Sequence, residues 1–571
     1  MKALHITFRY GKEVYGGAEL YFRHISEELK KHGIDIDICT TQTHTLTPFI
    51  KSGTAFDNIL RNETIDGIRV FRFPVKSQNR YLSLIFEKLI QRQRDREELE
   101  SSSEIRGIIT DSFLDTGGIL ADGWNHLERY GNSFMRWTKS DAAFMINDSD
   151  ISTISFSLNN PKGIFTRIEV SAHDHYEQRD FRSPLHWSTV RFQLPDVSGL
   201  VTVKIHCDTA WHPLKDFRSL GVAISSIRYE TQSGGKLISL EHDYRFFLNK
   251  QNRYIPYMMK CARDRPEFYS WMFDYLRGPE SPAMQRWLEK NISDYDIVLA
   301  QMLPFNTLKY SFIAKKFNKP LILLPLMHAD DEFYHWNHYY EMLKSADCVF
   351  SLTLFSKKQV FDILGAKSIA VGAGIEAGIF LNTEVNGSRF REKYHLTDKE
   401  IILTVSRKSP AKQYDYLIEA AEEIRHDHPR VVLVMIGPEE DNKPITSKNV
   451  LYLGKLGDKE LADAYDACDI FAMMSESESF GMVFCEAWSR KKPVIGNSNC
   501  GAVASLIDHG ADGLLCSDKT EVRRAIRQLL EDKKISDQFG ARGYQKVIER
   551  YTWDKISDQV YQCYNNLVRR G

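Results

Sequence analysis

The fold is indicated most clearly by residues 468–490, CDIFAMMSESESFGMVFCEAWSR. Its apolar beginning, Cys468 to Met474, predicts a buried strand, and its end, Phe480 to Arg490, predicts a helix. The Ser/Glu-rich segment between them is typical of a short loop. Free backbone N–H groups converge at the start of such a helix and bind anions, and Gly481 lets a ligand approach the main chain closely. The sequence therefore predicts an anion site at this junction.

Charged side chains surround the predicted anion site. Glu478 lies in the loop and Glu486 in the helix, so the anion would lie between them. Arg407 and Lys412 follow the predicted strand 401–406, and ligands of open α/β sheets bind beyond the carboxyl ends of strands. Arginine suits bidentate phosphate recognition, and lysine neutralises a leaving diphosphate. A solvated basic loop is the alternative, which the glutamate loop on a later strand of the same sheet disfavours.

The alternation of apolar strands and amphipathic helices extends through both ends of the chain. In the C-terminal third we expect strands at 401–406, 431–437, 468–474 and 493–496 and helices at 415–426, 459–466 and 480–490. At the other end we expect strands at 2–8 and 34–40 around a helix at 18–32, and further strands at 297–301, 320–326 and 348–352. This rhythm predicts two α/β domains, each a parallel sheet with helices on both faces.

Residues 103–232 follow a different pattern. Apolar and polar residues alternate at 151–158, 166–172, 188–194, 201–207 and 220–229, with Gly, Pro, Asp and Asn between the runs. Period-2 alternation is typical of half-buried strands, so we expect an all-β sandwich inserted in the N-terminal domain. Its four tryptophans are Trp124, Trp137, Trp187 and Trp211. They either pack in the core, the favoured interpretation, or form sugar-stacking platforms.

Composition limits the classes of partner. The 571 residues include 75 Lys and Arg against 76 Asp and Glu, so no basic excess favours nucleic acid. Nine scattered cysteines without a C-x-x-C pair argue against a disulfide scaffold and a structural zinc, and fit a reducing compartment. The apolar run 3–8 is too short for a signal sequence, and no run approaches the roughly 20 residues that span a bilayer. We therefore expect a soluble or peripheral protein.

Two features of the N-terminal half carry further chemistry. Gly16 and Gly17 precede the first helix, where paired glycines permit positive φ and close approach to a phosphate or sugar, although such a turn is more often only a turn. His328 follows the predicted strand 320–326. A histidine there can hydrogen-bond a sugar hydroxyl or a reacting oxygen, but a lone histidine is more often structural.

Metal-ligand patterns are weak. Asp294-Tyr295-Asp296 spells a D-x-D motif but directly precedes the strand 297–301, where aspartates commonly form a turn. His173-Asp174-His175 has ligand-type residues without a third partner in sight, so a surface turn is favoured. We expect no metal site and no other cofactor.

Four motifs resemble the retaining glycosyltransferases of family 4, which have a GT-B fold. They are Glu478-x7-Glu486 within ESFGMVFCEAW, Arg407 with Lys412 in VSRKSPAKQYDYLIEA, GGAE at 16–19, and YTWDKI at 551–556. They occur in the family's order and relative positions. The resemblance covers both α/β halves and stops at the inserted segment.

The resemblance implies a role for each matched residue. Arg407 and Lys412 would grip the diphosphate of a nucleotide sugar, and Glu486 would bind the ribose hydroxyls. Glu478 would face the donor sugar, and His328 would contact it. The remaining donor contacts would come from Gly16, Gly17 and the main chain of Phe480, Gly481, Met482 and Val483. Glu19 and Asp330, beside the Gly-Gly turn and His328, are assigned to the acceptor.

The chain departs from the family's pattern at two places. Gln413 stands where a glycine usually follows the lysine, and Cys500-Gly501-Ala502-Val503-Ala504 stands where Gly-Gly-x-x-Glu is common. The second change removes a carboxylate, which implies altered donor contacts. We expect an N-terminal acceptor domain of residues 1–102 and 233–370, the insert at 103–232, and a C-terminal donor domain of residues 371–571 whose final helix returns to the N-terminal domain.

The predicted function is transfer of a sugar, with retention, from a nucleotide-diphosphate sugar to a glycan or lipid-linked glycan in polysaccharide or glycoconjugate biosynthesis. We expect it in the cytoplasm, either free or at the inner face of the membrane. Residues 245–276 mix aromatics with Lys and Arg, and either rest on a membrane or pack as helices beneath the insert. The rivals are a GT-B epimerase or phosphorylase, and a silent glycan-binding scaffold. The donor base, sugar, linkage and oligomeric state are not predicted.

Overall fold

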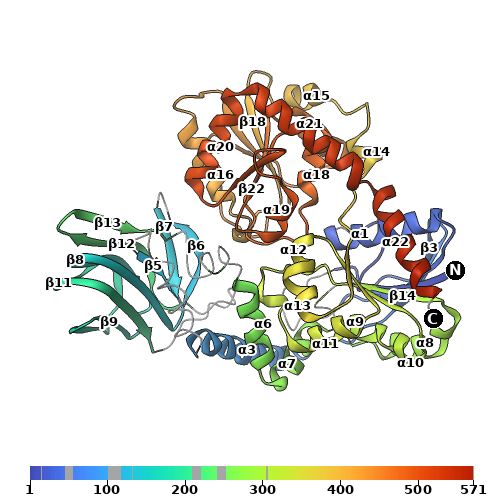
Figure 1. Ribbon diagram of the computed structural model, residues 1–571, viewed down its shortest axis with the longest axis horizontal. Helices are drawn as coiled ribbons and strands as arrows, with labels where there is room; N and C mark the ends of the chain where they lie inside the picture. Colours follow the sequence, from blue (N-terminus) through green and yellow to red (C-terminus); the bar gives the residue numbers. More distant parts are fainter. Residues whose placement is uncertain are drawn as a thin grey trace. The chain divides into compact units, whose positions relative to one another are not determined.

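A computed structural model describes residues 1–14, 16–45, 56–100, 118–121, 123–130, 133–208, 220–240, 248, 253–278, 280–301, 303 and 307–569 (Figure 1). The chain divides into two compact units. The first comprises Met1–Glu87 and Met258–Gly571, and the second comprises Lys88–Tyr257.

The N-terminal part of the first unit is an eight-stranded sheet in the order β17-β16-β15-β14-β1-β2-β4-β3. Its strands are β1 (Lys2–Ile6), β2 (Asp35–Thr41), β3 (Glu63–Ile65), β4 (Ile68–Phe73), β14 (Ile297–Gln301), β15 (Leu321–Leu324), β16 (Cys348–Ser351) and β17 (Ser368–Ala370). All pairs are parallel except β3 with β4. The two α/β patterns expected for this half therefore join in one sheet.

Helices pack around this sheet because its central strands are buried on both faces. Every residue of β14 and β15 is buried, as a parallel sheet covered on both sides requires. The helices of this part are α1 (Gly17–Lys31), α7 (Glu267–Arg277), α8 (Pro282–Asn291), α9 (Thr307–Ser311), α10 (Ile313–Lys316), α11 (Asn337–Ser345), α12 (Leu354–Ser356) and α13 (Asp362–Leu364). Along the chain, α3 (Arg80–Glu100) and α6 (Tyr254–Asp264) each run across a boundary between the two units.

The C-terminal part of the first unit is a six-stranded parallel sheet in the order β20-β19-β18-β21-β22-β23. Its strands are β18 (Glu400–Val405), β19 (Val431–Ile436), β20 (Val450–Tyr452), β21 (Ile470–Met473), β22 (Val494–Asn497) and β23 (Gly513–Cys516). Its helices are α14 (Ala377–Phe380), α15 (Gly387–Lys393), α16 (Tyr414–Ile424), α17 (Asp458–Ala467), α18 (Met482–Ser489), α19 (Gly501–Leu506), α20 (Lys519–Glu531) and α21 (Lys533–Arg550). The predicted alternation is confirmed, and β18 and β21 are direct neighbours.

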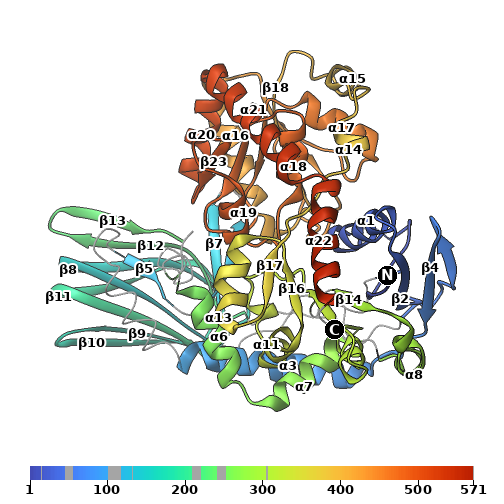
Figure 2. The ribbon, with the colours of Figure 1, turned by 45° about the vertical axis from the view of Figure 1, so that its right-hand side comes forward.

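The final helix, α22 (Trp553–Val568), packs against α1 of the N-terminal sheet (Figures 1 and 2). The Tyr564 hydroxyl lies 2.9 Å from Nε2 of His5 on β1, and the ring of Tyr561 stacks on His32. Burial lowers the pKa of His5 to about 3, so this contact joins two neutral groups. The helix therefore links the C-terminal sheet to the N-terminal one.

The second unit is built on one nine-stranded antiparallel sheet, in the order β10-β9-β11-β8-β12-β7-β6 with β13 on β12 and β5 on β8. Its strands are β5 (Gly118–Leu120), β6 (Trp124–Tyr130), β7 (Ser133–Thr138), β8 (Asp141–Asn160), β9 (Thr166–Ala172), β10 (His175–Phe181), β11 (Leu185–Cys207), β12 (Ala223–Thr231) and β13 (Gly234–Ile238). An apolar core of its own includes Phe144, Phe156 and Phe192. An all-β unit therefore interrupts the N-terminal part.

Two expectations for this unit are wrong. The runs 188–194 and 201–207 are not separate strands, because Asp196 and Gly199 take positive φ at register shifts within the single strand β11 rather than in a turn. The boundary at 232 falls inside the sheet, since β13 pairs with β12 beyond it.

The tryptophans of the insert differ in burial. Trp124 is buried and donates a hydrogen bond to the Ala143 carbonyl at 2.7 Å, which is a core role. Trp137 and Trp187 are partly buried, and Trp211 lies outside the described residues. Trp124 is therefore no platform for a sugar.

Candidate functional site

The loops after β18 and β21 lie side by side because these strands pair in parallel, with Ile402 opposite Ile470. The first loop includes a 3-10 turn, Pro410–Lys412, and the second is the Ser/Glu-rich segment. The backbone N–H of Glu476 donates to the Ala411 carbonyl at 2.9 Å, which joins the two loops. The carboxyl edge of this sheet is therefore where the predicted donor residues meet.

Lys412 and Glu478 form an enclosed ion pair at this edge. The Lys412 Nζ lies 2.5 Å from Glu478 Oε1 and 3.1 Å from the Ser475 hydroxyl. Only 11% and 14% of the two charged side chains are exposed. Burial alone would raise the pKa of Glu478, but the Lys412 charge and the hydrogen bonds from Lys412 and Ser475 hold it below its usual value. Glu478 is therefore ionised near neutral pH.

The surroundings of Gln413 show how this residue is accommodated where the family that the sequence resembles usually has a glycine. It has φ of +44°, in the left-handed region that usually favours glycine. Its side-chain amide donates to Glu476 at 2.9 Å and accepts from Asn497 at 3.3 Å. These bonds fix the side chain beside the Lys412 loop, which offsets the backbone strain.

Arg407 does not join the Lys412–Glu478 pair. Its guanidinium lies 3.1 Å from both carboxylate oxygens of Glu440, and 57% of the side chain is exposed. The adjacent Lys408 is instead buried, where it donates to Asp441 and Glu439. The burial of Lys408 was not predicted from sequence, because Lys408 lies in a polar loop where nothing indicates a buried charge.

The start of α18 has the geometry predicted for an anion site. Gly481 takes φ of +95° at the N-cap, so another residue would be strained there. Phe480 is buried against the ring of Tyr551. Met482 faces α1, because a Cβ added at Gly17 would lie 3.8 Å from its Cε. Gly17 and the α18 start therefore face each other.

Neither Gly16 nor Gly17 takes the positive φ that paired glycines permit. Gly16 has φ of 175°, an extended backbone that any residue adopts, and Gly17 opens α1 without a positive φ. Gly16 is needed for space instead, since an added Cβ would clash with Oε2 of Glu19. Glu19 is buried and accepts two bonds from Arg9, at 3.1 and 2.5 Å. The structure thus gives this carboxylate a structural partner.

His328 reaches the Glu478 loop from the N-terminal sheet. Its Nδ1 lies 3.2 Å from the Ser477 hydroxyl, and its ring stacks on Tyr334. Burial lowers the pKa of His328, although the Glu478 charge acts in the opposite direction. The ring is therefore neutral near pH 7, and it can donate or accept a hydrogen bond.

Asp330 faces the C-terminal part. Its Oδ2 accepts a 2.8 Å bond from the Gly501 N–H, and burial raises its pKa to about 7. Gly501 itself has no room for a side chain, because an added Cβ would lie 2.0 to 2.3 Å from ring atoms of Phe355. The segment at 500–504 lacks the glutamate common in the family that the sequence resembles. The Asp330 carboxylate, from the N-terminal part of the unit, contacts the main chain of this segment at Gly501.

Glu486 differs from Glu478 although both belong to the same motif. The Tyr465 hydroxyl donates to its Oε2 at 2.7 Å, and burial raises its pKa to about 7. No cation pairs with it among the described residues. Near neutral pH, the motif therefore holds one ionised carboxylate, Glu478, and one carboxyl group that is partly protonated, Glu486.

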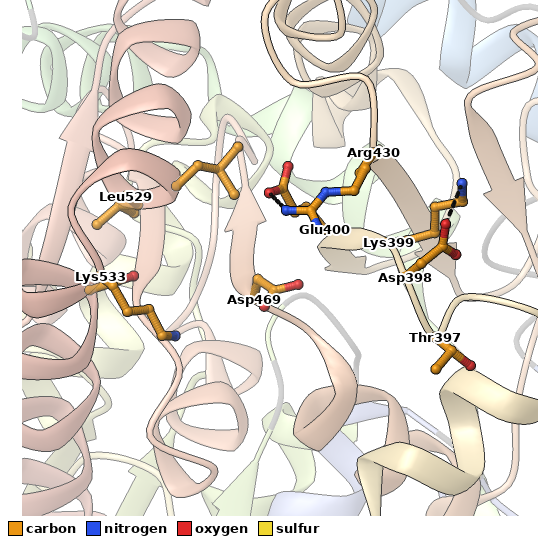
Figure 3. Close-up of a pocket in the computed structure, with 10 residues that line it drawn as sticks. Thr397, Asp398, Lys399, Glu400, Arg430, Asp469, Leu529 and Lys533 are labelled. Carbon is orange, nitrogen blue, oxygen red and sulfur yellow. Dashed lines mark hydrogen bonds and ion pairs between the residues drawn. The ribbon is translucent and has the colours of Figure 1, made fainter.

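A separate pocket of about 280 Å³ lies at the opposite, amino edge of the C-terminal sheet (Figure 3). Glu400, which starts β18, and Asp469, which precedes β21, both line it. The other lining residues are Thr397, Asp398, Lys399, Arg430, Leu529, Leu530, Lys533 and Ser536. We assign the site to the carboxyl edge, because ligands of such sheets bind there and because the enclosed charges meet there.

The two motifs considered as metal ligands lie at a strand start and in a surface turn. Asp296 Oδ2 accepts the Lys2 N–H at 2.7 Å, which fixes the start of β1. His173 and Asp174 lie exposed in the turn between β9 and β10. Across the described ranges, no group of three or more His, Cys, Asp or Glu residues has metal-binding geometry.

Comparison with known proteins places the carboxyl-edge residues in an enzyme domain. Residues 388–546 match the family described as glycosyl transferases group 1. The matched residues include Arg407, Lys412, Glu478 and Glu486, so the carboxyl-edge residues lie within the part of the chain that is similar to this family.

Two curated relatives extend the match. N-acetyl-alpha-D-glucosaminyl L-malate synthase of Bacillus anthracis is 29% identical over 192 residues, 32% of this chain and 50% of that protein. D-inositol 3-phosphate glycosyltransferase of Kineococcus radiotolerans is 25% identical over 258 residues, 40% of this chain and 59% of that protein. The chain thus matches about half the length of these relatives.

A solved structure supports the fold. Sucrose-phosphate synthase from Thermosynechococcus elongatus has a TM-score of 0.51 and 13% identity, with 100% of each chain covered. At this identity the likeness concerns the α/β fold alone.

Proposed function

We propose that this protein is a retaining glycosyltransferase of family 4 with a GT-B fold. It moves a sugar from a nucleotide-diphosphate sugar to a glycan or glycolipid. The observation that carries the proposal is the enclosed Lys412–Glu478 pair at the carboxyl edge of a glycosyltransferase domain. Holding two charges away from water costs free energy, and a reaction that develops charge there gives a reason to keep them.

The charges match those of the transition state. Departure of a nucleoside diphosphate builds negative charge on phosphate and positive charge at the anomeric carbon. Lys412 and the main-chain amides at the start of α18 would stabilise the phosphate, and Arg407 would leave Glu440 to do the same. Such contacts strengthen as the charge develops, so they lower the barrier more than they tighten ground-state binding.

Glu478 would stabilise the sugar rather than attack it. Its carboxylate is ionised and bound to Lys412, which orients it and lowers its nucleophilicity. Transfer would proceed on one face of the sugar, with the leaving phosphate taking the acceptor proton. Neutral His328, held by Ser477 and Tyr334, would hydrogen-bond a sugar hydroxyl. The reaction as drawn needs no metal.

Glu486 would bind the ribose. Its carboxyl group lies beside Tyr465 with a pKa near 7, so it both accepts and donates hydrogen bonds to hydroxyl groups. This separates the nucleoside end of the donor from its sugar end, where Glu478 lies.

The N-terminal part would bind the acceptor. The insert would be a sandwich-type domain that binds glycan. Partly buried Trp137 and Trp187 remain its candidate stacking residues. The described cysteines are all free thiols, which suits the reducing cytoplasm.

The test is release of nucleoside diphosphate from a panel of nucleotide sugars, with and without oligosaccharide acceptors. We expect one donor to be consumed in an acceptor-dependent way, and the product's anomeric configuration by NMR to match the donor's. Inversion would contradict retention. Binding of glycan without any binding of nucleotide sugars would contradict an enzyme function altogether.

A further inference from the structure

The first half of α3 exposes apolar side chains. Tyr81, Leu84 and Ile85 are 78%, 44% and 52% exposed, and their spacing places them on one face of the helix. Phe86 and Ile90 are buried on the opposite side. A helix that only packs on the core needs one apolar face, so the second face of α3 calls for a partner outside the described chain.

Helix α7 continues this surface. Phe268 and Trp271 are 58% and 56% exposed and stack on each other with ring centroids 6.1 Å apart. Trp271 also meets Phe86 of α3 edge-on at 5.3 Å. We call the resulting surface the α3–α7 face. Its members are Tyr81, Leu82, Leu84, Ile85, Phe268 and Trp271.

Exposed cations lie on α3 itself and on α6, the helix that precedes α7 along the chain. Arg80 and Lys88 lie on α3, and Lys260 and Arg263 lie one turn apart on α6, which leads directly into α7. The exposed carboxylates nearby are Asp264 and Glu267. Cations therefore outnumber carboxylates around an aromatic and aliphatic surface.

We propose that the α3–α7 face docks the protein on an anionic lipid bilayer. Tyr and Trp rings prefer the interfacial region, the aliphatic side chains enter the acyl boundary, and the bordering cations attract acidic headgroups. No helix of the described ranges is long and apolar enough to cross a membrane, and surface docking needs none. The inference goes beyond the proposed reaction, and places the enzyme where a lipid-linked acceptor is presented.

The face revises the membrane segment expected from sequence. Of residues 245–276, those at 245–247 and 249–252 lie outside the described residues, and Met258 and Met259 of α6 are buried. Of the segment's apolar side chains, only Phe268 and Trp271 of α7 belong to the face, and α6 contributes the cations Lys260 and Arg263. The other half of the surface comes from α3, almost 190 positions earlier in the chain.

The test is co-sedimentation of the full chain with vesicles of equal parts phosphatidylcholine and phosphatidylglycerol. We expect the wild type to bind, Leu84→Gln with Ile85→Gln to bind about tenfold more weakly because apolar area is lost, and the control Ile363→Gln, an equally exposed residue of α13, to bind like the wild type. Lys88→Glu with Arg263→Glu should abolish the preference for anionic over pure phosphatidylcholine vesicles.

Two results would overturn the proposal. Wild-type protein that stays in the supernatant with anionic vesicles excludes lipid docking, as does unchanged binding of the Leu84→Gln, Ile85→Gln variant. If sedimentation velocity shows a wild-type dimer and a monomeric Leu84→Gln, Ile85→Gln variant, the face binds a second copy of the chain instead. Turnover with a soluble acceptor should be unchanged in the variant, so failure here leaves the proposed reaction untouched.

Discussion

The two edges of the C-terminal sheet both carry clustered charges, but water reaches them differently. At the amino edge, Arg430 pairs with Glu400 at 2.8 Å with most of the arginine in solvent. At the carboxyl edge, Lys412 and Glu478 are both enclosed. Exposed pairs contribute little to stability, and enclosed pairs cost desolvation free energy. Burial of a charge pair, rather than the number of charges, therefore distinguishes the edge to which we assign the site.

The largest effect should come from removing the enclosed cation. We expect Lys412→Ala to lower donor turnover by about 10²–10³-fold, because the leaving diphosphate loses its counter-charge. The variant also leaves Glu478 buried without its cation, which destabilises the fold by about 3–5 kcal/mol. Lys412→Met with Glu478→Gln separates the two effects: chemical denaturation should show recovered stability, while release of nucleoside diphosphate stays low. Wild-type turnover in either variant would contradict the site.

The contact at Gly501 should rank next. Gly501→Ala forces a Cβ into the ring of Phe355, which we expect to cost about 1–3 kcal/mol of unfolding free energy. Removing the Phe355 ring should relieve the clash. In a double-mutant cycle, Phe355→Ala combined with Gly501→Ala should therefore be less destabilised than the sum of the single variants. Strict additivity would show that the two residues do not touch.

Asp330 should give the carboxyl edge a pH dependence. The pKa of Asp330 is about 7 in the folded protein against an ordinary value of 3.8, so between these values the native state binds more protons than the unfolded state. Stability should therefore fall as pH rises from about 4 to 7 and then level off, by at most roughly 4 kcal/mol for this group. Asp330→Asn keeps an acceptor for the Gly501 N–H and should flatten that slope in denaturant titrations. An unchanged slope would place the titration elsewhere.

Arg407 should have a smaller effect than Lys412 because it starts in solvent. We expect Arg407→Ala to raise KM for the donor about tenfold and to change the unfolding free energy by less than about 0.5 kcal/mol. Glu440→Gln is the matched control, since it weakens the competing pair and should leave KM equal or lower. A larger loss of kcat than of donor affinity would show that Arg407 acts mainly in the transition state.

The amino edge should give the smallest effect. Arg430→Ala removes the exposed pair with Glu400, and we expect a change in unfolding free energy below about 0.5 kcal/mol and wild-type turnover. Thermal unfolding and donor turnover measure both. A loss of activity as large as that of Lys412→Ala would erase the distinction between the edges.

The parallel sheets could be predicted from sequence because their strands are short continuous apolar runs. Segments such as 297–301 and 431–437 coincide with β14 and β19 almost to the residue. The insert was harder, since Asp196 and Gly199 read as a turn and instead form irregularities within β11. Local composition does not distinguish a bulge from a turn, because both need positive φ.

The candidate site was partly predictable for the same reason. Lys412 and Glu478 each follow an apolar strand, so topology brings them together. The contact of Asp330 with Gly501 joins positions 171 apart and leaves no local pattern. The Gly-Gly turn does not use the positive φ that paired glycines permit, and at Gly16 the glycine instead leaves room for Oε2 of Glu19. Sequence shows that a glycine is needed, but not which constraint requires it.

The return of α22 to the N-terminal sheet has a consequence for the order of folding during synthesis. The buried His5 of β1 has its Tyr564 partner 559 positions later. A ribosome adds roughly 5–20 residues per second, so β1 waits on the order of a minute for this helix. Until then, the α1 surface that α22 covers stays open to solvent and to chaperones. The N-terminal half can thus collapse early, but it is completed only when α22 has been made.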